Sequence, residues 1–318
     1  MSARKFFDPA RVQRIAPRDG AATESGQDGR TYVYYDPDVV LAVNVALATN
    51  RPLLLSGPSG CGKSSLARNV AASLGRRYYE QVITARTEGR DLLYRFDAVR
   101  RLNDAQSSRA AELPPLVRYV EPGALWWALS PETAVNRGSA TALPPEHRAH
   151  DPSAIAAEDA VVLLDEIDKA DPDLPNSLLV PLGSFRFKVD PTEAEITAFR
   201  SPLIFITNNG ERELPTTFVR RCVALSLTTP GEDDLLDIAR ELVPRDKWNE
   251  ALFRALAGRL IELATDPAVN ASQRSSTAEY LDAVRACHEL DVTSESDPDF
   301  KTLLEITLTK LQPSSGLP

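Results

Sequence analysis

A glycine-rich segment between two apolar stretches carries the clearest chemical signal in the sequence. Residues 57–64 read Gly-Pro-Ser-Gly-Cys-Gly-Lys-Ser, which matches the phosphate-loop pattern in full. In such a loop, backbone N–H groups surround a phosphate, and the positive end of the following helix adds to the attraction. We predict that Lys63 bridges phosphate oxygens and that Ser64 ligates Mg²⁺. The residues of this segment that we expect to contact the ligand are Gly57, Pro58, Ser59, Gly60, Cys61, Gly62, Lys63, Ser64 and Ser65.

The surroundings of this segment support the same interpretation. Residues 52–55 form an apolar run long enough only for a buried strand. After the loop, Leu66, Val70 and Leu74 mark one face of a helix that ends at Gly75. An ordinary glycine-rich turn is the alternative, but it does not require a strand before it and a helix after it.

Two carboxylates follow a second apolar strand pattern further along the chain. Residues 161–164 read Val-Val-Leu-Leu, and Asp165 and Glu166 come directly after them. A parallel strand presents such residues at the carboxyl edge of its sheet, where open α/β folds bind ligands. We expect Asp165 to hold Mg²⁺, directly or through water, and Glu166 to polarise an attacking water. The alternative is a solvated acidic helix start, since Asp168 also suits a first helical turn.

Amide side chains end a third apolar strand, which we place at residues 203–207. An amide at this position can orient the attacking water or contact the terminal phosphate. We favour Asn208 for this role and keep Asn209 as the alternative. A simple Asn-Asn-Gly turn after a strand would have the same sequence.

Arg220 and Arg221 close a short helical segment that begins at Leu214 and Pro215. Paired arginines are usually solvated surface charges. The local pattern therefore leaves their function open.

Strands that alternate with helices predict a parallel sheet covered on both sides, the α/β architecture of a phosphate-loop protein. We place the α/β domain at residues 31–229, after a flexible arm at 1–30, and we expect a mobile insertion at about 131–159. Beyond Pro230 only helical patterns remain, so residues 230–318 should form a separate helical domain. The other expected elements are a helix at 38–50, strands at 80–84 and 223–227, a helical segment at 90–105, a hairpin at 185–199, and helices at 235–242, 252–263, 280–290 and 300–311.

Composition excludes some classes of function and disfavours others. A chain of 318 residues with 43% hydrophobic residues is long enough for one α/β core and a smaller domain. The formal net charge of −9 would repel a nucleic-acid backbone, so nucleic acid is an unlikely partner. Cys61, Cys222 and Cys287 have neither metal-ligand nor disulfide spacing, which favours a reducing cytoplasm. We find no membrane span and no secretory signal in the sequence.

The motifs together resemble the AAA+ superfamily of ATPases, and within it the MoxR branch and its dynein-related relatives. The resemblance extends over about residues 31–311. The residues that carry it are the segments 57–64, 164–168, Asn208 and 214–221, with support from 91–97, 121–127 and 273–277.

This resemblance implies a five-stranded parallel sheet, a helical lid domain, and hexamers that bind ATP with Mg²⁺ between neighbouring subunits. Arg220 or Arg221 would be an arginine finger that enters the neighbouring subunit's site, and Arg274 would be the sensor arginine of the lid. MoxR-like ATPases remodel or activate partner proteins that contain von Willebrand factor A domains. This sequence shows no such domain, so the resemblance implies a separate protein client.

Three other functions compete with this one. A nucleotide-gated binding module would not need Glu166, and a small-molecule kinase would not need Arg220, Arg221 or a helical lid. A DNA-directed AAA+ ATPase of restriction, defence or replication shares the core, but the acidic charge and the lack of a DNA-binding motif disfavour it. We expect Trp126 and Trp127 to pack a helix against the core, although a substrate pore is the alternative.

Overall fold

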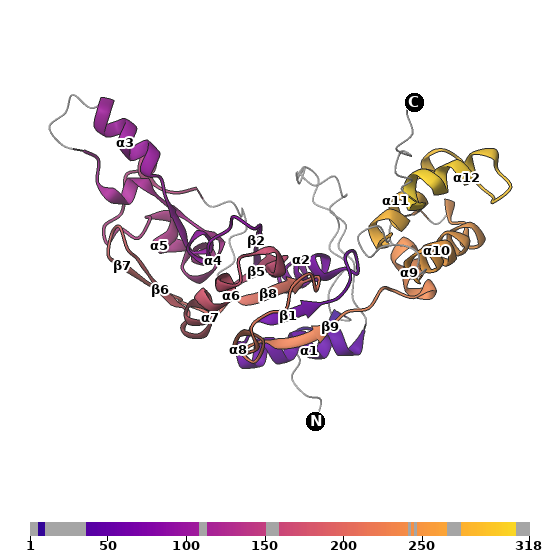
Figure 1. Cartoon of the computed structure of the whole chain (residues 1–318), viewed down its shortest axis with the longest axis horizontal. Helices are drawn as coiled ribbons and strands as arrows, with labels where there is room; N and C mark the ends of the chain where they lie inside the picture. Colours follow the sequence, from indigo (N-terminus) through magenta and orange to yellow (C-terminus); the bar gives the residue numbers. More distant parts are fainter. Residues whose placement is uncertain are drawn as a thin grey trace. The chain divides into compact units, whose positions relative to one another are not determined.

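The computed structural model describes residues 6–9, 36–107, 113–150, 159–240, 243–244, 247–265 and 275–309. These residues belong to two compact units, whose elements are traced in Figure 1. The first unit contains the segments 36–56 and 64–226. The second contains the loop Gly57–Lys63 and the described residues from Leu227 onward.

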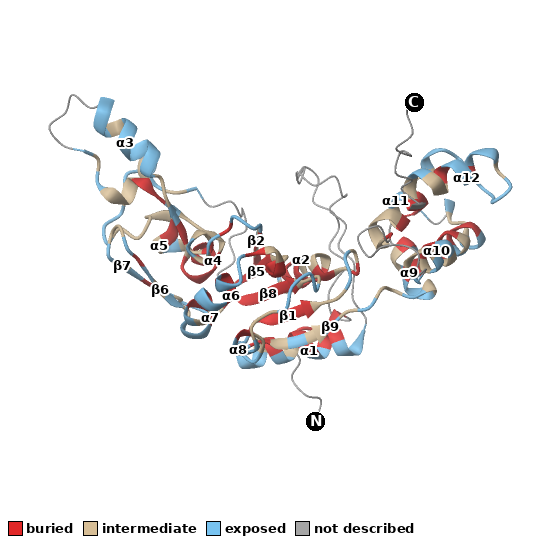
Figure 2. Cartoon of the chain, viewed as in Figure 1, coloured by how far each residue is buried: buried red, intermediate tan, exposed pale blue. Residues whose placement is uncertain are grey.

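A five-stranded parallel sheet forms the centre of the first unit, in the order β2-β5-β8-β1-β9. Two of its three inner strands, β5 and β8, consist mainly of β-branched residues and leucine and are buried along most of their length, as the red strands of Figure 2 show. This sheet confirms the predicted α/β core. The strands are β1 (Leu53–Ser56), β2 (Arg77–Val82), β5 (Ala160–Asp165), β8 (Leu203–Asn208) and β9 (Val223–Ser226).

The strand register aligns the carboxyl ends of the inner strands. Ser56 of β1 lies opposite Asn208 of β8, and Leu164 of β5 lies opposite Ile206 of β8. Residues that follow β1, β5 and β8 therefore meet at one edge of the sheet.

Helices pack on this sheet and connect its strands. Helix α1 contacts β1 and β9, and α4 contacts β2 and β5. The start of α1 is set by Asp36, whose side chain accepts a hydrogen bond from the backbone N–H of Asp38, and by Pro37 in the first turn. The helices of this unit are α1 (Pro37–Thr49), α2 (Lys63–Leu74), α3 (Ala98–Ser107), α4 (Ala124–Leu129), α5 (Pro131–Val135), α6 (Asp173–Ser177), α7 (Leu179–Ser184) and α8 (Thr216–Val219). Short 3₁₀ turns lie at η2 (Gly89–Leu92), η3 (Leu116–Tyr119), η4 (Pro145–His147) and η5 (Ile167–Lys169).

Two antiparallel hairpins extend from the first unit. The hairpin of β6 (Arg186–Val189) and β7 (Ala194–Thr197) confirms the one predicted at residues 185–199. The other pairs β3 (Tyr94–Phe96) with β4 (Val120–Pro122). The predicted helical segment at 90–105 is therefore wrong in its first half, because the buried Tyr94 belongs to a strand and the helix begins only at Ala98.

The segment predicted as a mobile insertion, 131–159, contains regular structure over residues 131–150. This segment contains α5, with Ala134 fully buried. Arg137 connects the segment to the rest of the unit, because its guanidinium donates to the carbonyl oxygens of His147, at 2.9 Å, and of Val120. Residues 151–158 lie outside the described part of the chain.

Four residues of the predicted flexible arm at 1–30 are described, and they are packed on α1. The backbone N–H groups of Phe6 and Phe7 donate to Asn44 Oδ1 at 2.7 and 3.0 Å, and Asn44 Nδ2 donates to the Phe7 carbonyl at 2.8 Å. Phe7 is fully buried. Residues 6–9 are thus held in place by the buried Phe7 ring and by the hydrogen bonds of the Asn44 amide. Residues 1–5 and 10–35 lie outside the described residues.

The two tryptophans of α4 pack into the core of the first unit, as predicted. Trp126 is fully buried, and its Nε1 donates to Thr133 Oγ1 at 3.0 Å. Its ring meets the Phe187 ring edge to face at a centroid distance of 5.5 Å. Trp127 is also buried.

Helices alone make up the described part of the second unit after β9. Their apolar faces meet in one core that includes Leu235, Leu256, Tyr280 and Val284. The helical domain expected after Pro230 therefore has its own hydrophobic core. Its elements are α9 (Glu232–Arg240), α10 (Glu250–Thr265), α11 (Thr277–Glu289) and α12 (Pro298–Leu304), which continues into a short π-helical turn, η8 (Glu305–Thr309).

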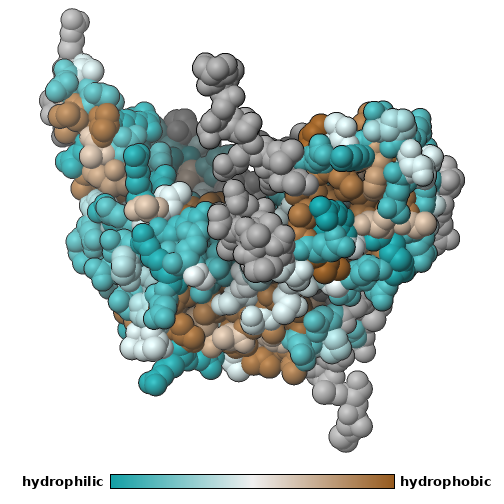
Figure 3. Space-filling view, turned by 45° about the vertical axis from the view of Figure 1, so that its right-hand side comes forward, coloured by the Kyte–Doolittle hydropathy of each residue, from teal (hydrophilic) through white to brown (hydrophobic). Residues whose placement is uncertain are grey.

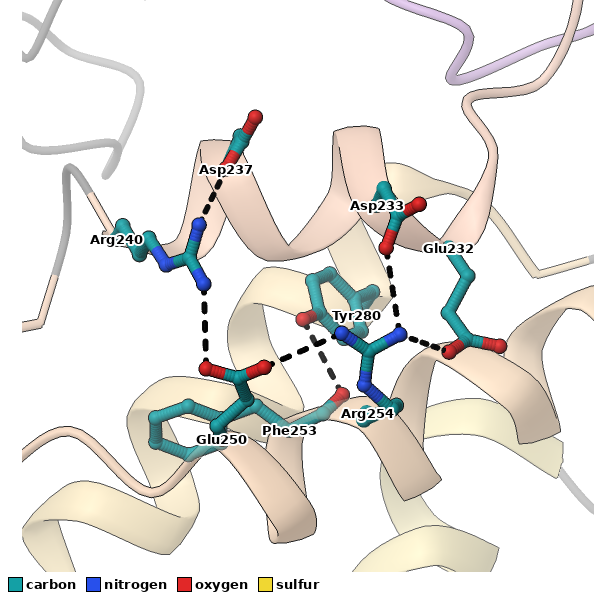
Figure 4. Close-up of polar contacts among 8 residues, drawn as sticks. All are labelled: Glu232, Asp233, Asp237, Arg240, Glu250, Phe253, Arg254 and Tyr280. Atoms are coloured by element: carbon teal, nitrogen blue, oxygen red, sulfur yellow. Dashed lines mark hydrogen bonds and ion pairs between the residues drawn. The ribbon is translucent and has the colours of Figure 1, made fainter.

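Ion pairs lie beside this core, between α9 and α10 and within α10, as Figure 4 shows. The Arg254 guanidinium contacts Glu232 at 2.6 Å and Glu250 at 3.2 Å, and Arg240 contacts Glu250 at 3.2 Å. The hydrogen bond from Arg254 lowers the pKa of Glu250. Because these side chains are exposed, each ion pair contributes little to the free energy of unfolding.

The described surface carries separate hydrophobic patches. In Figure 3 these patches lie among hydrophilic side chains on the face that is drawn. Among the described residues, the most exposed large hydrophobic side chain is Phe199, at 80%. No helix in the described part of the chain combines the length and the apolar composition needed to cross a membrane.

Two phenylalanines allow a matched test of the core. We expect Phe205→Ala, in the buried strand β8, to lower the free energy of unfolding by about 3–5 kcal/mol, because it leaves a cavity in the sheet core. The control Phe199→Ala removes the same atoms from an exposed site and should change it by less than about 0.5 kcal/mol. Urea unfolding followed by tryptophan fluorescence measures both. Equal effects would mean that β8 is not part of the core.

Candidate functional site

The loop between β1 and α2 places a buried lysine beside its own backbone. Lys63 is only 6% exposed, and its Nζ donates to the carbonyl oxygens of Gly57 and Pro58, both at 2.8 Å. Within the described residues, no carboxylate forms an ion pair with it. Its other contact is with the Cys61 sulfur, at 4.0 Å. A buried ammonium group that has only uncharged partners favours an anionic ligand.

The shape of this loop requires glycine. Gly57, Gly60 and Gly62 have φ values of 149°, 76° and 94°, in the region that side chains disfavour. A Cβ atom at Gly57 would also lie 2.3 Å from the carbonyl oxygen of Leu227. The backbone can therefore curve in this way only with these glycines.

The other predicted residues of the segment differ in exposure. Pro58 and Ser59 are exposed, whereas Ser65 is half-buried in the first turn of α2. Cys61 is buried, and burial raises the pKa of its thiol, which therefore stays neutral at physiological pH.

The first turn of α2 reaches the acidic strand directly. Ser64 Oγ lies 2.9 and 3.0 Å from the two carboxylate oxygens of Asp165, to which it donates. This contact brings the first turn of α2 next to the end of β5. A hydroxyl and a carboxylate are the oxygen ligands that Mg²⁺ prefers, so this pair fits the predicted metal role.

Thr207 connects the two acidic residues to β8. It is fully buried, its hydroxyl donates to Asp165 Oδ1, and its Oγ1 accepts a hydrogen bond of 2.8 Å from the backbone N–H of Glu166. Glu166 has φ 62° and ψ 48°, a left-handed conformation that a glutamate rarely adopts. The bond to Thr207 holds this strained turn in place.

Both carboxylate oxygens of Glu166 have partners in the same unit. Lys169 Nζ lies 2.8 Å from Oε2, and Asn209 Nδ2 lies 3.3 Å from Oε1. The hydrogen bond to Glu166 raises the pKa of Lys169, so the lysine is charged at neutral pH. The predicted base is thus held by one cation and one amide.

The two asparagines after β8 have different contacts. Asn209 reaches Glu166, whereas Asn208 Oδ1 accepts a hydrogen bond of 2.7 Å from the Gly210 N–H and so closes the turn. We favoured Asn208 for the contact to the reacting groups. The structure brings Asn209, the alternative, to Glu166.

Arg220 and Arg221 are both exposed at the end of α8, and the described residues show no contact from either to Asp165 or Glu166. Arg221 Nη1 donates to the Leu179 carbonyl at 3.1 Å. No hydrogen bond of the Arg220 guanidinium is found within the described chain. Arg51 fixes the backbone of this pair, because its guanidinium donates to the carbonyl oxygens of Arg221, at 3.1 Å, and of Arg220. Arg274 lies outside the described residues.

Sequence reasoning assigned no function to Thr207, Lys169 or Arg51. Thr207 is a polar residue in an otherwise apolar strand, which is a signal that can be read from the sequence. Lys169 lies three residues after Glu166, and side chains at this spacing eclipse in a 3₁₀ turn. Nothing in the sequence pattern indicates the contact of Arg51, which spans 170 positions.

Comparison with known families gives one match. The model described as AAA domain (dynein-related subfamily) matches residues 52–239, more than half of the chain. The matched region begins just before β1 and contains the glycine loop, the acidic strand, both asparagines and both arginines. None of the curated proteins matches the chain.

The bridging role of Thr207 can be tested by removing its hydroxyl. We expect Thr207→Val to lower the free energy of unfolding by about 1–3 kcal/mol, because the Glu166 N–H loses its acceptor while the volume stays the same. Urea unfolding measures this loss. The control Thr197→Val, at an exposed position of β7, should have little effect. An unchanged midpoint for Thr207→Val would show that its two bonds do not hold the turn.

Proposed function

The chain belongs to the dynein-related subfamily of AAA domains, and we propose that it is a MoxR-like AAA+ ATPase. In this proposal it hydrolyses ATP in a ring oligomer and uses the cycle to remodel or activate a separate protein. The contact between Ser64 and Asp165 is the observation that carries it, because it joins the helix after the glycine loop to the acidic strand.

The residues around the loop divide the work of binding. Lys63 and the loop backbone bind the phosphates of ATP, and Ser64 and Asp165 hold Mg²⁺. When bound, Mg²⁺ neutralises charge on the phosphate oxygens. The buried position of Lys63 supports its role, since a phosphate would compensate its charge in place of the carbonyl oxygens.

Glu166 orients and polarises the attacking water in this mechanism, with Asn209 as the amide that contacts it. Their distance of 3.3 Å supports this pairing, and Asn208 then serves to shape the turn. Each Glu166 carboxylate oxygen accepts one of these contacts, from Lys169 or from Asn209, and keeps a lone pair with which it can accept from a water.

We assign the arginine finger to Arg220 and a structural role to Arg221. The guanidinium of Arg221 is bound to the Leu179 carbonyl of its own chain, whereas that of Arg220 is exposed. An arginine finger supplied by a neighbouring subunit is worth about 10³–10⁵ in rate, so assembly would control activity. The proposed role of Arg274 as the lid's sensor arginine rests on the sequence resemblance alone.

The proposed assembly and client follow from the MoxR resemblance. It supports a homohexamer in the cytoplasm and a client with a von Willebrand factor A domain. An ATP-trapped Glu166→Gln ring offers a bait for identifying this client by co-purification. Turnover stimulated by DNA would instead favour a DNA-directed machine.

The catalytic role of Glu166 predicts a variant that binds but does not hydrolyse. We expect Glu166→Gln to keep Mg-ATP binding and to lower hydrolysis by at least about 10²-fold, because an amide cannot serve as a base. Calorimetry measures binding, phosphate release measures turnover, and sedimentation should show an assembled state trapped by ATP. The control Glu132→Gln, at an exposed position, should behave as wild type. Unchanged hydrolysis in Glu166→Gln would refute the assignment.

The assignment of the finger predicts different effects of the two arginines. We expect Arg220→Ala to lower turnover by about 10³-fold or more and to abolish its dependence on protein concentration, while Arg221→Ala keeps most activity. Mixing provides the sharper test. Arg220→Ala and Glu166→Gln subunits, each inactive alone, should regain activity together, because one supplies Glu166 and the other supplies Arg220. A mixture without activity would argue against a finger acting between subunits.

A further inference from the structure

We propose that Asp168 is a positioning residue for ATP hydrolysis. Its buried carboxylate fixes the loop after β8 and thereby holds the Asn209 side chain against Glu166. This inference rests on the proposed role of Glu166 and adds a residue for which the sequence pattern indicated only a helix start.

Asp168 forms a clamp on the loop of residues 209–211. The side chain lies in the 3₁₀ turn η5 and is only 2% exposed. Its Oδ2 accepts hydrogen bonds from the backbone N–H groups of Asn209, at 3.0 Å, and Glu211, at 2.9 Å. A carboxylate is costly to bury unless such donors compensate it, so these two bonds are the reason that it can lie there.

The clamp joins the segments after β5 and β8 at a point where these two strands are no longer paired. Backbone pairing between β5 and β8 ends at Leu164 and Ile206. Beyond this pair, the side chains of Thr207 and Asp168 join the two segments. The loop also contains Gly210 at φ 83°, a residue with wide backbone freedom. The bond from the Gly210 N–H to Asn208 Oδ1 closes the turn, and the clamp adds two bonds that tie the loop to the turn after β5.

The loop determines where Asn209 points. Asp168 binds the backbone N–H of Asn209, and the side chain of the same residue donates to Glu166 Oε1 at 3.3 Å. Glu166 and Asp168 lie two residues apart in one turn. The turn that carries the proposed base thus also sets the position of the amide that contacts it.

One oxygen of Asp168 is sufficient for the clamp. Both bonds end on Oδ2, and within the described residues the buried Oδ1 has no hydrogen-bond partner. An asparagine has one oxygen in the same place and should hold the loop, whereas an alanine should not.

Steady-state kinetics of the full-length chain tests the proposal. We expect Asp168→Ala to lower kcat about 10- to 100-fold, since misplacement of a group by about 1 Å can cost about 10²-fold, and to leave KM for ATP nearly unchanged. Asp168→Asn should keep most of the wild-type kcat. The control Asp171→Ala removes an exposed aspartate whose side chain accepts from the Asp173 N–H, and it should behave as wild type.

A double-mutant cycle separates positioning from stability. If Asp168 acts through Asn209, the kcat of Asp168→Ala with Asn209→Ala should be no lower than that of the worse single variant. Two independent losses would multiply instead. Amide hydrogen exchange adds a readout besides activity: the Asn209 and Glu211 amides should be protected in the wild type and in Asp168→Asn, and exposed in Asp168→Ala.

The outcomes distinguish this proposal from the proposed function. Wild-type protein without hydrolysis, or Glu166→Gln with full hydrolysis, would refute the function, and fast exchange of both amides would refute the clamp. If the wild type hydrolyses ATP and Glu166→Gln does not, the proposed function stands. The positioning role is then overturned by a wild-type kcat in Asp168→Ala, or by losses of kcat that multiply in the variant carrying both Asp168→Ala and Asn209→Ala. If Asp168→Ala does not fold, Asn209→Ala decides, because a wild-type kcat in that variant excludes the contact from catalysis.

Discussion

The hydrogen bonds from Ser64 to Asp165 are the contact on which the site depends. Ser64 lies in the first turn of the helix that follows the glycine loop, and Asp165 ends a strand that lies two positions away from β1 in the sheet order. A parallel sheet makes this meeting possible, because strands that run the same way end at the same edge. The contact forms an oxygen pair suited to Mg²⁺, and one member of this pair, Ser64, directly follows Lys63 in the chain.

Side chains connect the segments after β5 and β8 beyond the last backbone pair of these two strands. Thr207 holds the turn at Glu166, and Asp168 holds the loop that carries Asn209. Each of these residues is buried, so each bond forms in surroundings where a lost partner is costly. The proposed reacting groups therefore sit on a framework of buried hydrogen bonds, and their positions are set before a ligand arrives.

A second connection reaches the arginine pair. Arg51 lies two residues before β1 and donates to the carbonyl oxygens of Arg220 and Arg221. Arg51 therefore links the start of β1, which leads into the glycine loop, to the backbone of the arginine pair. We propose that this pair serves a neighbouring subunit. Arg221 has a further bond to Leu179, which leaves Arg220 as the exposed member of the pair.

The α/β core, the glycine loop and the acidic end of β5 can be predicted from the amino-acid sequence alone, because these features depend on local pattern. Gly57 and Gly62, followed by a lysine and a serine, identify a phosphate loop when they come after a strand. Apolar runs at β5 and β8 predict inner strands for the same reason. The local pattern failed at residues 94–96 of the predicted helical segment 90–105, where apolar spacing resembled a helix and pairing with β4 made a strand.

Which residue of each adjacent pair, the two asparagines and the two arginines, makes a given contact follows from the three-dimensional structure. Asn208 and Asn209 have the same chemistry, and the sequence could not show that the turn after β8 directs Asn209 to Glu166. Arg51 binds the backbone carbonyls of both Arg220 and Arg221, whereas the Leu179 carbonyl accepts from the Arg221 guanidinium. Both partners lie far away in the chain. Distances between remote residues depend on packing and strand register, and these follow from the whole fold rather than from any local stretch of sequence.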